Sequence, residues 1–347
     1  MREPLPVTIL TGFLGSGKTT LLRRVLASPR FCDTAVVVNE LGEIALDHHL
    51  VETVEGTVLE LPGGCLCCAV REDLARVLRG LIEKRDLGEL KAFRRLAIET
   101  TGLADPAPIL FTLGADPVLD ARLALAGVTT LVDAVLGAHS LERFAEAARQ
   151  VALADRILIT KTDLAPFSRD LEERLGRLNP TAPRLLAGAR PAGEVRRGSF
   201  PAGRARGVAE TACGEEGALL FETPMRRFAA PAGDTGAAAH SHGIDSFALF
   251  LEKPLSRLDF ARALGALAAA RGSDLLRVKG ILSFSDRAGG PAFVEAAQHA
   301  LYAPLWLEGW PDGDARNRLQ FIVHEIPREE VLERFAFAAP RLGDGRG

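Results

Sequence analysis

Glycine, lysine and threonine residues with the spacing of a phosphate-binding loop follow an apolar run near the start of the chain. The segment from Gly12 to Thr19 reads G-F-L-G-S-G-K-T and fits the pattern G-x-x-x-x-G-K-[ST]. Glycines allow a tight turn whose backbone N–H groups point at phosphate oxygens, and the start of the following helix adds positive potential. We expect Lys18 to neutralise the β- and γ-phosphates and the Thr19 hydroxyl to bind Mg²⁺. The predicted phosphate-binding residues are Gly12, Gly15, Ser16, Gly17, Lys18, Thr19 and Thr20.

A carboxylate at the end of a neighbouring strand is the second part that a metal-bound nucleotide requires. Glu99 follows the apolar run 96–98 and leads into Thr100, Thr101 and Gly102. We predict that Glu99 holds Mg²⁺ through a water molecule and that the backbone amide of Gly102 senses the γ-phosphate. The alternative interpretation of Glu99 is an ordinary acid at a strand end.

The base of the nucleotide should be read at the end of a later strand. The segment T-K-T-D, from Thr160 to Asp163, follows the apolar run 157–159 and is similar to the N-K-x-D pattern of GTPases. Asp163 can accept hydrogen bonds from guanine N1–H and the exocyclic amine, while the stem of Lys161 covers the base. Adenine lacks this donor pair, so Asp163 favours GTP over ATP. Thr160 stands where asparagine is usual, which predicts a weaker guanine preference, and helix capping by Asp163 is compatible with this role.

Three cysteines within four residues form a candidate metal site. Cys65, Cys67 and Cys68 follow Gly63 and Gly64, which permit the sharp turn that three converging thiolates need. Thiolates are soft ligands that suit zinc or Cu(I). Three protein ligands leave a fourth position open, which suits exchange of the ion better than a permanent structural zinc. Buried or redox-active cysteines are the alternative.

An acidic segment follows the apolar run 35–38, at the position of a first switch loop. It reads N-E-L-G-E from Asn39 to Glu43, with Asp47, His48 and His49 beyond. Glu40 could contact Mg²⁺, orient water or complete the metal site, and a solvated acidic loop is the alternative. The candidate catalytic residues are therefore Lys18, Glu99 and Glu40.

The remaining cysteines and histidines indicate no further site. Cys32 and Cys213 are isolated, which favours structural or incidental roles. The pair His240 and His242 is too short to form a histidine-rich tract, so we expect a weak metal-binding role or none. The other isolated histidines in apolar surroundings, His299 and His324, are typical of ordinary core or surface positions.

The composition limits the classes of protein that can carry these motifs. The chain has 347 residues, which suggests two domains, and 47% of them are hydrophobic, which is enough for a substantial core. A net charge of −3 gives no general reason to expect nucleic-acid or membrane binding. We find no signal-peptide pattern before the first strand, and five cysteines with this spacing are no disulfide framework. A reducing cytoplasm fits best.

Short apolar runs alternate with helical patterns in the first half of the chain. Such alternation predicts a doubly wound, mostly parallel α/β sheet of the P-loop NTPase type, which binds ligands at the carboxyl ends of its strands. The expected strands are 7–10, 35–38, 58–61, 96–98, 128–132 and 157–159. The expected helices are 19–27, 72–85, 141–152 and 170–178.

The second half predicts a smaller α+β domain after a linker. Residues 188–243 are rich in Gly, Ala, Pro and Arg, which favours an extended linker between a domain at 1–187 and one at 244–340. In the second domain we expect strands at 245–251, 275–284 and 319–326 and helices at 256–270 and 329–337. Residues 293–301 fit either a helix or a strand.

Together these motifs resemble those of the CobW family of GTPases, relatives of the UreG and HypB metallochaperones. The resemblance depends on five motifs and covers nearly the whole chain outside the linker: T-G-F-L-G-S-G-K-T-T (11–20), N-E-L-G-E (39–43), G-G-C-L-C-C (63–68), E-T-T-G-L-A-D-P (99–106) and T-K-T-D-L (160–164). The segment R-V-K-G-I-L (277–282) and residues 310–335 are similar to the family's second domain. Leu41 in place of phenylalanine, Thr160 in place of asparagine and the lack of a long histidine tract depart from the family pattern.

The resemblance implies a slow GTPase whose nucleotide state controls metal binding and delivery to a client metalloprotein. Family members are linked to zinc homeostasis, cobalamin synthesis and the maturation of metalloenzymes. Carried over by motif, Cys65, Cys67 and Cys68 would bind zinc, with cobalt as the lesser alternative, and Lys161 and Asp163 would bind guanine. A nucleotide-dependent homodimer is a further expectation, and slow hydrolysis agrees with the lack of an obvious arginine finger in the sequence.

Two other functions fit parts of the pattern. In a GTP-dependent scaffold or regulator the cysteines would have a structural role. Replacing them would then leave the zinc affinity of the protein unchanged. A small-molecule P-loop kinase would use ATP and an acceptor, against which the T-K-T-D segment already counts.

Overall fold

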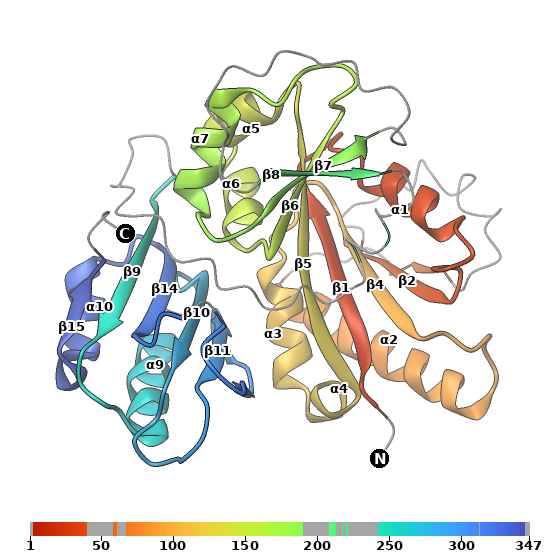
Figure 1. Cartoon of the computed structure of the whole chain (residues 1–347). Helices are drawn as coiled ribbons and strands as arrows, with labels where there is room; N and C mark the ends of the chain where they lie inside the picture. Colours follow the sequence, from red (N-terminus) through yellow and green to blue (C-terminus); the bar gives the residue numbers. More distant parts are fainter. Residues whose placement is uncertain are drawn as a thin grey trace. The chain divides into compact units, whose positions relative to one another are not determined.

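The computed structural model describes residues 3–39, 58–60, 67–189, 208–212, 217, 220, 242–311 and 313–343. The chain divides into two compact units, and each contains one β-sheet (Figure 1). None of the helices in the described ranges combines the length and apolar character that crossing a bilayer requires.

The sheet of the first unit is parallel throughout. Its strand order is β3-β2-β4-β1-β5-β6-β7-β8, so the order reverses at β1, which lies between β4 and β5 in Figure 1. This topology confirms the predicted doubly wound α/β fold and makes the carboxyl end of β1 the expected ligand site. The strands are β1 (Leu5–Gly12), β2 (Thr34–Asn39), β3 (Val58–Glu60), β4 (Arg95–Thr100), β5 (Leu123–Asp133), β6 (Arg156–Thr160), β7 (Arg184–Ala189) and β8 (Val208–Ala212).

Helix α1 starts directly after the glycine-rich loop because Gly17 adopts a left-handed backbone conformation, with φ 92°, at its N-cap. Its apolar face, including Leu21 and Val25, packs against Leu10 and Leu131 of the sheet. The helices in this half of the chain are α1 (Lys18–Leu26), α2 (Cys67–Leu87), α3 (Ala107–Ala115), α4 (Pro117–Arg122), α5 (Gly137–Arg143), α6 (Ala145–Ala152) and α7 (Arg169–Leu178). The last residues of α6 and most of α7 are grouped with the second unit.

Besides strand β7, which the sequence prediction does not contain, three features of the first unit differ from that prediction. The helix expected over 141–152 is interrupted at Phe144, whose backbone is extended (φ −122°, ψ 118°). Helices α3 and α4 are additional: Pro106 and Pro117 look like helix breakers but occupy positions at helix starts, where proline is tolerated.

Strand β8 is the third difference, because it lies inside the segment 188–243 that we predict to be a linker. It pairs in parallel with β7, and the nearby Leu220 is buried in the core beside α1. Neither feature is visible in a stretch rich in Gly, Ala, Pro and Arg, because strand formation depends on the neighbouring strand as much as on propensity. The linker prediction is therefore wrong for 208–212, while the domain limits at 187 and 244 stay predictions.

The second unit contains an antiparallel sheet covered by helix α9 (Arg257–Arg271), with α10 (Arg328–Arg334) packed beside it. The strand order is β12-β11-β10-β14-β9-β15, and β13 also pairs with β11. The predicted smaller α+β domain is confirmed in kind. Its strands are β9 (Ile244–Leu251), β10 (Arg277–Leu282), β11 (Ala292–Ala297), β12 (Ala300–Leu301), β13 (Leu305–Trp306), β14 (Asn317–His324) and β15 (Pro340–Leu342).

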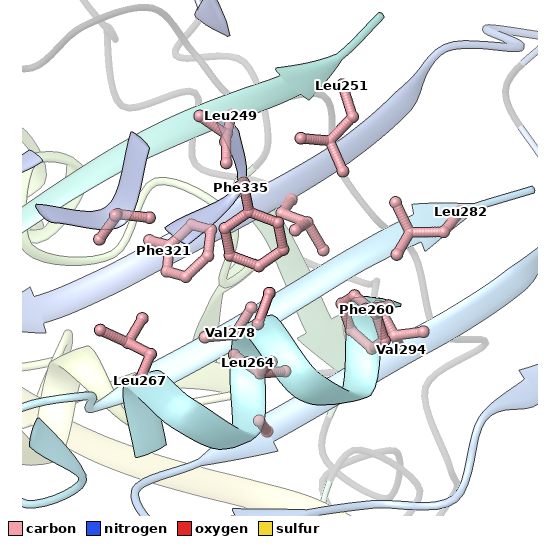
Figure 2. Packing of buried hydrophobic residues seen from close by; sticks show 14 of the residues in the cluster. Leu249, Leu251, Phe260, Leu264, Leu267, Val278, Leu282, Val294, Phe321 and Phe335 are labelled. Atoms are coloured by element: carbon pink, nitrogen blue, oxygen red, sulfur yellow. The ribbon is translucent and has the colours of Figure 1, made fainter. Parts of the chain in front are cut away.

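The core of the second unit is apolar on the side of the sheet that faces α9. Figure 2 shows Leu264 and Leu267 of α9 beside Val278 of β10, with Phe321 and Phe335 close by. The rings of Phe321 and Phe335 meet edge to face, with centroids 5.9 Å apart. Ser256 caps α9 by accepting a hydrogen bond from the backbone N–H of Asp259, at 3.1 Å.

The ambiguous segment 293–301 is a β-hairpin. Strands β11 and β12 are joined by Gln298 and His299, and Gln298 adopts a left-handed conformation with φ 51°. Next to this hairpin, the ring of Trp306 lies edge-on to Phe284, and the guanidinium of Arg287 stacks on its face at 3.4 Å from the centroid.

Candidate functional site

The glycine-rich loop after β1 has the backbone conformations that its sequence predicts. Gly12, Gly15 and Gly17 have φ values of 144°, 71° and 92°, which L-residues with a side chain rarely adopt. At Gly12 a Cβ atom would also lie 2.5 Å from the carbonyl oxygen of Leu131. The loop therefore depends on glycine for conformation at three positions and for space at Gly12.

Lys18 is buried at the first position of α1. Its ammonium donates hydrogen bonds to the carbonyl oxygens of Gly12, at 2.6 Å, and Phe13, at 3.2 Å. Burial lowers the pKa of Lys18, and the nearby charge of Glu99 acts in the opposite direction. The lysine thus closes over its own loop, and a bound phosphate would offer it oxygens that carry more negative charge.

Thr19 and Glu99 are in direct contact. The Thr19 hydroxyl donates to Oε1 of Glu99 at 2.7 Å, and Glu99 is buried at the end of β4 beside β1. A hydroxyl and a carboxylate are the hard oxygen donors that Mg²⁺ prefers. Within the described part of the chain, the buried Ser16 hydroxyl of the same loop has no hydrogen-bond partner, which costs about 1–3 kcal/mol unless a ligand supplies one. These residues fit a magnesium-bound phosphate.

The loop after β4 packs on the phosphate loop. A Cβ atom at Gly102 would lie 2.7 Å from both Cα and N of Leu14, so only glycine fits there. The buried side-chain amide of Gln150, in α6, donates to the carbonyl oxygens of Gly102, at 3.1 Å, and Ala104, at 3.0 Å. Sequence reasoning missed Gln150, since nothing near it in the chain marks a functional residue.

At the end of β6, Thr160 contacts the phosphate loop. Its hydroxyl donates to the carbonyl oxygen of Ser16 at 2.7 Å. Thr160 therefore joins the segment predicted to bind the base to the segment predicted to bind phosphate, a contact that its difference from asparagine alone did not predict. Asp163, two residues beyond Lys161, is exposed at the same edge of the sheet.

Lys161 adopts a left-handed conformation, with φ 56°, and forms an ion pair with Asp133 at the end of β5. The distance from Nζ to Oδ2 of Asp133 is 2.5 Å. Phe13 of the phosphate loop stacks on Phe144, the residue at the break between α5 and α6, with ring centroids 4.6 Å apart. Neither Asp133 nor Phe144 was among the predicted site residues, because each acts through a partner that is distant in sequence.

The predicted thiolate site lies largely outside the described residues. The structure does not describe Cys65 or the side chains of Cys67 and Cys68, but it places the backbone of Cys67 and Cys68 in the first turn of α2. Glu40 and His240 also lie outside the described residues. Within the described ranges, no group of three or more His, Cys, Asp or Glu residues could hold a metal ion.

The other candidates occupy ordinary positions. Thr20 is exposed on α1, and His242 is partly buried with a φ of 50°. His324 Nδ1 lies 3.1 Å from Oδ1 of Asp274, as expected for a satisfied histidine, and His299 packs against Gly272. Cys32 is exposed, and its sulfur contacts the carbonyl oxygen of Pro29.

Two family descriptions match the chain, one in each half. Residues 6–185 match "CobW/HypB/UreG, nucleotide-binding domain", and residues 244–339 match "Cobalamin synthesis protein cobW C-terminal domain". The chain belongs to the CobW/HypB/UreG family. This assignment confirms the resemblance on which the sequence analysis depended.

Relatives of this family match either nearly the whole chain or about half of it. The Escherichia coli protein "Zinc chaperone YjiA" is 34% identical over 339 residues, which cover 96% of this chain and 98% of the relative. The Schizosaccharomyces pombe protein "Zinc-regulated GTPase metalloprotein activator 1" is 36% identical over 169 residues, 47% of this chain and 40% of its own length. Among solved structures, the Zn(II)-bound YjiA GTPase of E. coli is 31% identical, with a TM-score of 0.69 and coverage of 97% of this chain and 99% of that chain.

Proposed function

We propose that this chain is a GTP-hydrolysing metallochaperone, which binds zinc at Cys65, Cys67 and Cys68 and transfers it to a client metalloprotein under the control of the bound nucleotide. The contact between Thr19 and Glu99 carries the nucleotide half of the proposal, because it brings a phosphate-loop hydroxyl and a strand-end carboxylate within 2.7 Å. Similarity to zinc chaperones over the full chain supports the metal half. A cluster of three cysteines within four residues, proposed to act as thiolate ligands, suits a reducing cytoplasm.

The first unit supplies the parts that GTP hydrolysis requires. Mg²⁺, held by Thr19 and Glu99, would neutralise the charge that develops on the β- and γ-phosphates. Lys18 would exchange its bonds to Gly12 and Phe13 for phosphate oxygens, and the Gly102 amide would contact the γ-phosphate. Glu40 is proposed to orient the attacking water, and hydrolysis without a partner would be slow.

The base would be bound between the ends of β5 and β6. The carboxylate of Asp163 is exposed and available to N1–H and the exocyclic amine of guanine, while the stem of Lys161 covers its face. Thr160 already bonds the phosphate loop through Ser16, so base and phosphate binding share one rigid connection. We therefore expect GTP to be preferred over ATP.

The sheet order supports the proposed coupling between the nucleotide state and the thiolates. The cysteine segment connects β3 to α2, and β3 is two strands from β4, which ends near Glu99. Strands are about 4.8 Å apart, so the two strand ends are separated by about 10 Å. The start of α2 at Cys67 also places positive helix potential where thiolates would form. Loss of the γ-phosphate could thus change the thiolate geometry and release zinc, or cobalt as the lesser alternative.

Zinc titration tests the metal half of the proposal. Replacement of Cys65, Cys67 and Cys68 by serine should abolish the tightest zinc site, whereas Cys32→Ser, at an exposed position, should leave it intact. Affinity must be measured together with stoichiometry, because a YjiA variant in which one glutamate and two cysteines are replaced by alanine is described as Zn(II)-bound. An unchanged tight site in the triple variant would favour the scaffold function with structural cysteines.

Nucleotide control requires a second measurement. Zinc affinity and zinc release should differ among the GTP-bound, GDP-bound and nucleotide-free protein. Equal values in the three states would remove the coupling on which the transfer mechanism depends. A phosphorylated small-molecule product, with ATP used as well as GTP, would instead indicate a kinase.

A nucleotide-dependent homodimer would cover exposed apolar side chains around the nucleotide site. These residues follow the carboxyl ends of β1, β4, β5 and β6 and are Leu14, Leu103, Val135, Leu136 and Leu164. Sedimentation velocity with and without a non-hydrolysable GTP analogue tests this proposal. Leu103→Ser should weaken the GTP-bound dimer, and a monomer in every nucleotide state would exclude the dimer.

A further inference from the structure

Asp133 is a buried carboxylate whose two oxygens have different partners. Oδ1 accepts hydrogen bonds from the backbone N–H groups of Val135, at 2.7 Å, and Leu136, at 3.3 Å. Oδ2 accepts from the ammonium of Lys161 at 2.5 Å. Asp133 is only 7% exposed, and aspartate is rarely buried to this extent without a charged partner. The first oxygen caps the turn after β5, and the second is free to act on Lys161.

The ion pair with Asp133 is one of the contacts that restrain Lys161, whose backbone has a positive φ of 56°. A left-handed conformation in a residue other than glycine costs about 1–2 kcal/mol, and surrounding contacts must hold it. The Lys161 carbonyl oxygen accepts from the backbone N–H groups of Leu164 and Ala165, which forms the turn that contains Asp163. Its side chain reaches from the end of β6 to the end of β5, where Asp133 pairs with Thr160 in the strand register. Both ends of the lysine stem are therefore fixed.

We propose that Asp133 is a positioning residue for base recognition, which holds the stem of Lys161 in the place where it covers the purine face. The inference rests on the proposed binding of a guanine nucleotide at this edge of the sheet. Asp133 itself touches neither base nor phosphate in this role. It acts through Lys161, whereas Asp163 selects guanine among the purines.

The test separates the base-dependent part of the affinity from the phosphate-dependent part. Asp133→Asn keeps a carbonyl oxygen for the N–H groups of Val135 and Leu136 but removes the charge that holds Lys161. Dissociation constants are measured for GTP, ITP and inorganic tripolyphosphate in the presence of Mg²⁺. We expect about tenfold weaker binding of both GTP and ITP, with tripolyphosphate unaffected, an increased KM for GTP and an unchanged kcat.

The variant Lys161→Met tests the same ion pair by removing its other partner. It keeps most of the stem but lacks the ammonium, and a third of the Lys161 side chain is exposed, so the fold should tolerate the change. The loss of GTP affinity should equal that of Asp133→Asn, and the double variant should lose no more than either single variant. Additive losses would show that the two residues act independently and would overturn the proposal.

A purely structural role for Asp133 predicts a different result. If Asp133→Asn lowers tripolyphosphate affinity as much as GTP affinity, or changes neither, Asp133 does not position the base. Failure of the proposed function is distinguishable, because it would appear as equal binding of GTP and ATP by the unaltered protein and no effect of Asp163→Ala. In that case ATP would still report whether Asp133 and Lys161 contribute to base binding.

Discussion

The carboxyl edge of the parallel sheet and the core of the second unit differ in the kind of side chain that they bury. At the edge, polar groups such as Lys18, Glu99 and Asp133 are buried, and the Ser16 hydroxyl has no hydrogen-bond partner among the residues that the structure describes. In the second unit, the side of the sheet that faces α9 is covered by apolar residues and aromatic rings. Burial of polar groups costs free energy, while burial of apolar groups supplies it. The edge is therefore organised for binding, and the second core for stability.

The comparison predicts that truncation of the second core should damage folding alone. Phe335 is fully buried and contacts Phe321, so Phe335→Ala should lower the free energy of unfolding by about 3–5 kcal/mol. The nucleotide affinity of the folded fraction should not change. Denaturant titration and nucleotide-binding measurements check the two effects. A large loss of GTP affinity at low denaturant would contradict the view that the second core affects stability alone.

The reverse result is expected at Lys18. Lys18→Met should weaken GTP binding at least about a hundredfold, since it removes the charge that faces the phosphates. The free energy of unfolding without nucleotide should hold or rise by about 1 kcal/mol, because a buried ammonium is no longer desolvated. The same change at the exposed Lys253 should affect neither quantity.

The pH dependence of the Lys18 variant sharpens this prediction. Burial lowers the pKa of Lys18 in the folded state below its ordinary value of 10.5, so the unfolded chain binds more protons between the two values. Stability of the unaltered protein relative to Lys18→Met should therefore rise as the pH increases through the lowered folded pKa towards 10.5. A relative stability that falls over this alkaline range would contradict the desolvation of Lys18.

Thr160 should show a mixed effect, because it is buried and also connects the two segments that are proposed to bind the nucleotide. Thr160→Val removes the hydrogen bond to the Ser16 carbonyl, so we expect a loss of about 1 kcal/mol in stability and several-fold weaker GTP binding. Thr8→Val is the matched control, since the Thr8 hydroxyl makes a similar buried bond to the carbonyl of Leu220, at 2.8 Å. The control should lose stability but keep its GTP affinity, as measured by calorimetry.

The smallest expected effect concerns a surface carboxylate of the second unit. A hydrogen bond from Arg316 is the main cause that lowers the pKa of Asp314 from 3.8 to about 2. This stabilisation is present above pH 3.8 and is lost as the pH falls towards 2. Asp314→Asn should therefore cost about 1 kcal/mol near neutral pH, after allowance for solvent screening. Denaturation at two pH values checks it, and an equal cost at pH 2 would exclude the ionic origin.

Sequence patterns predicted the parts of this molecule that are continuous in the chain. The segment from Gly12 to Thr19 has a local spacing that determines both its conformation and its chemistry, so its geometry was foreseeable. Gln150 and Asp133 were not, because each is recognisable only through a distant partner: the carbonyl of Gly102 for the former and the Lys161 ammonium for the latter. The predicted metal and nucleotide ligands themselves stay predictions.

The prediction of secondary structure failed where contacts with distant residues, and not local composition, determine the structure. Strand β8 forms against β7 in a segment that looks like a linker, and the hairpin at Gln298 required a left-handed residue that the sequence does not mark. The break at Phe144 coincides with a ring contact to Phe13, which is more than a hundred residues away in the chain. Long-range contacts of this kind override propensity.

The aromatic side chains of the hairpin region have a spectroscopic consequence. The chain contains two tryptophans and one tyrosine, Trp306, Trp310 and Tyr302, and all of them belong to the second unit. Tryptophan and tyrosine emission therefore reports directly on the second unit, where Arg287 stacks on Trp306. A change in tryptophan emission on addition of GTP would therefore show, without an added label, that nucleotide binding in the first unit affects the surroundings of these side chains in the second unit.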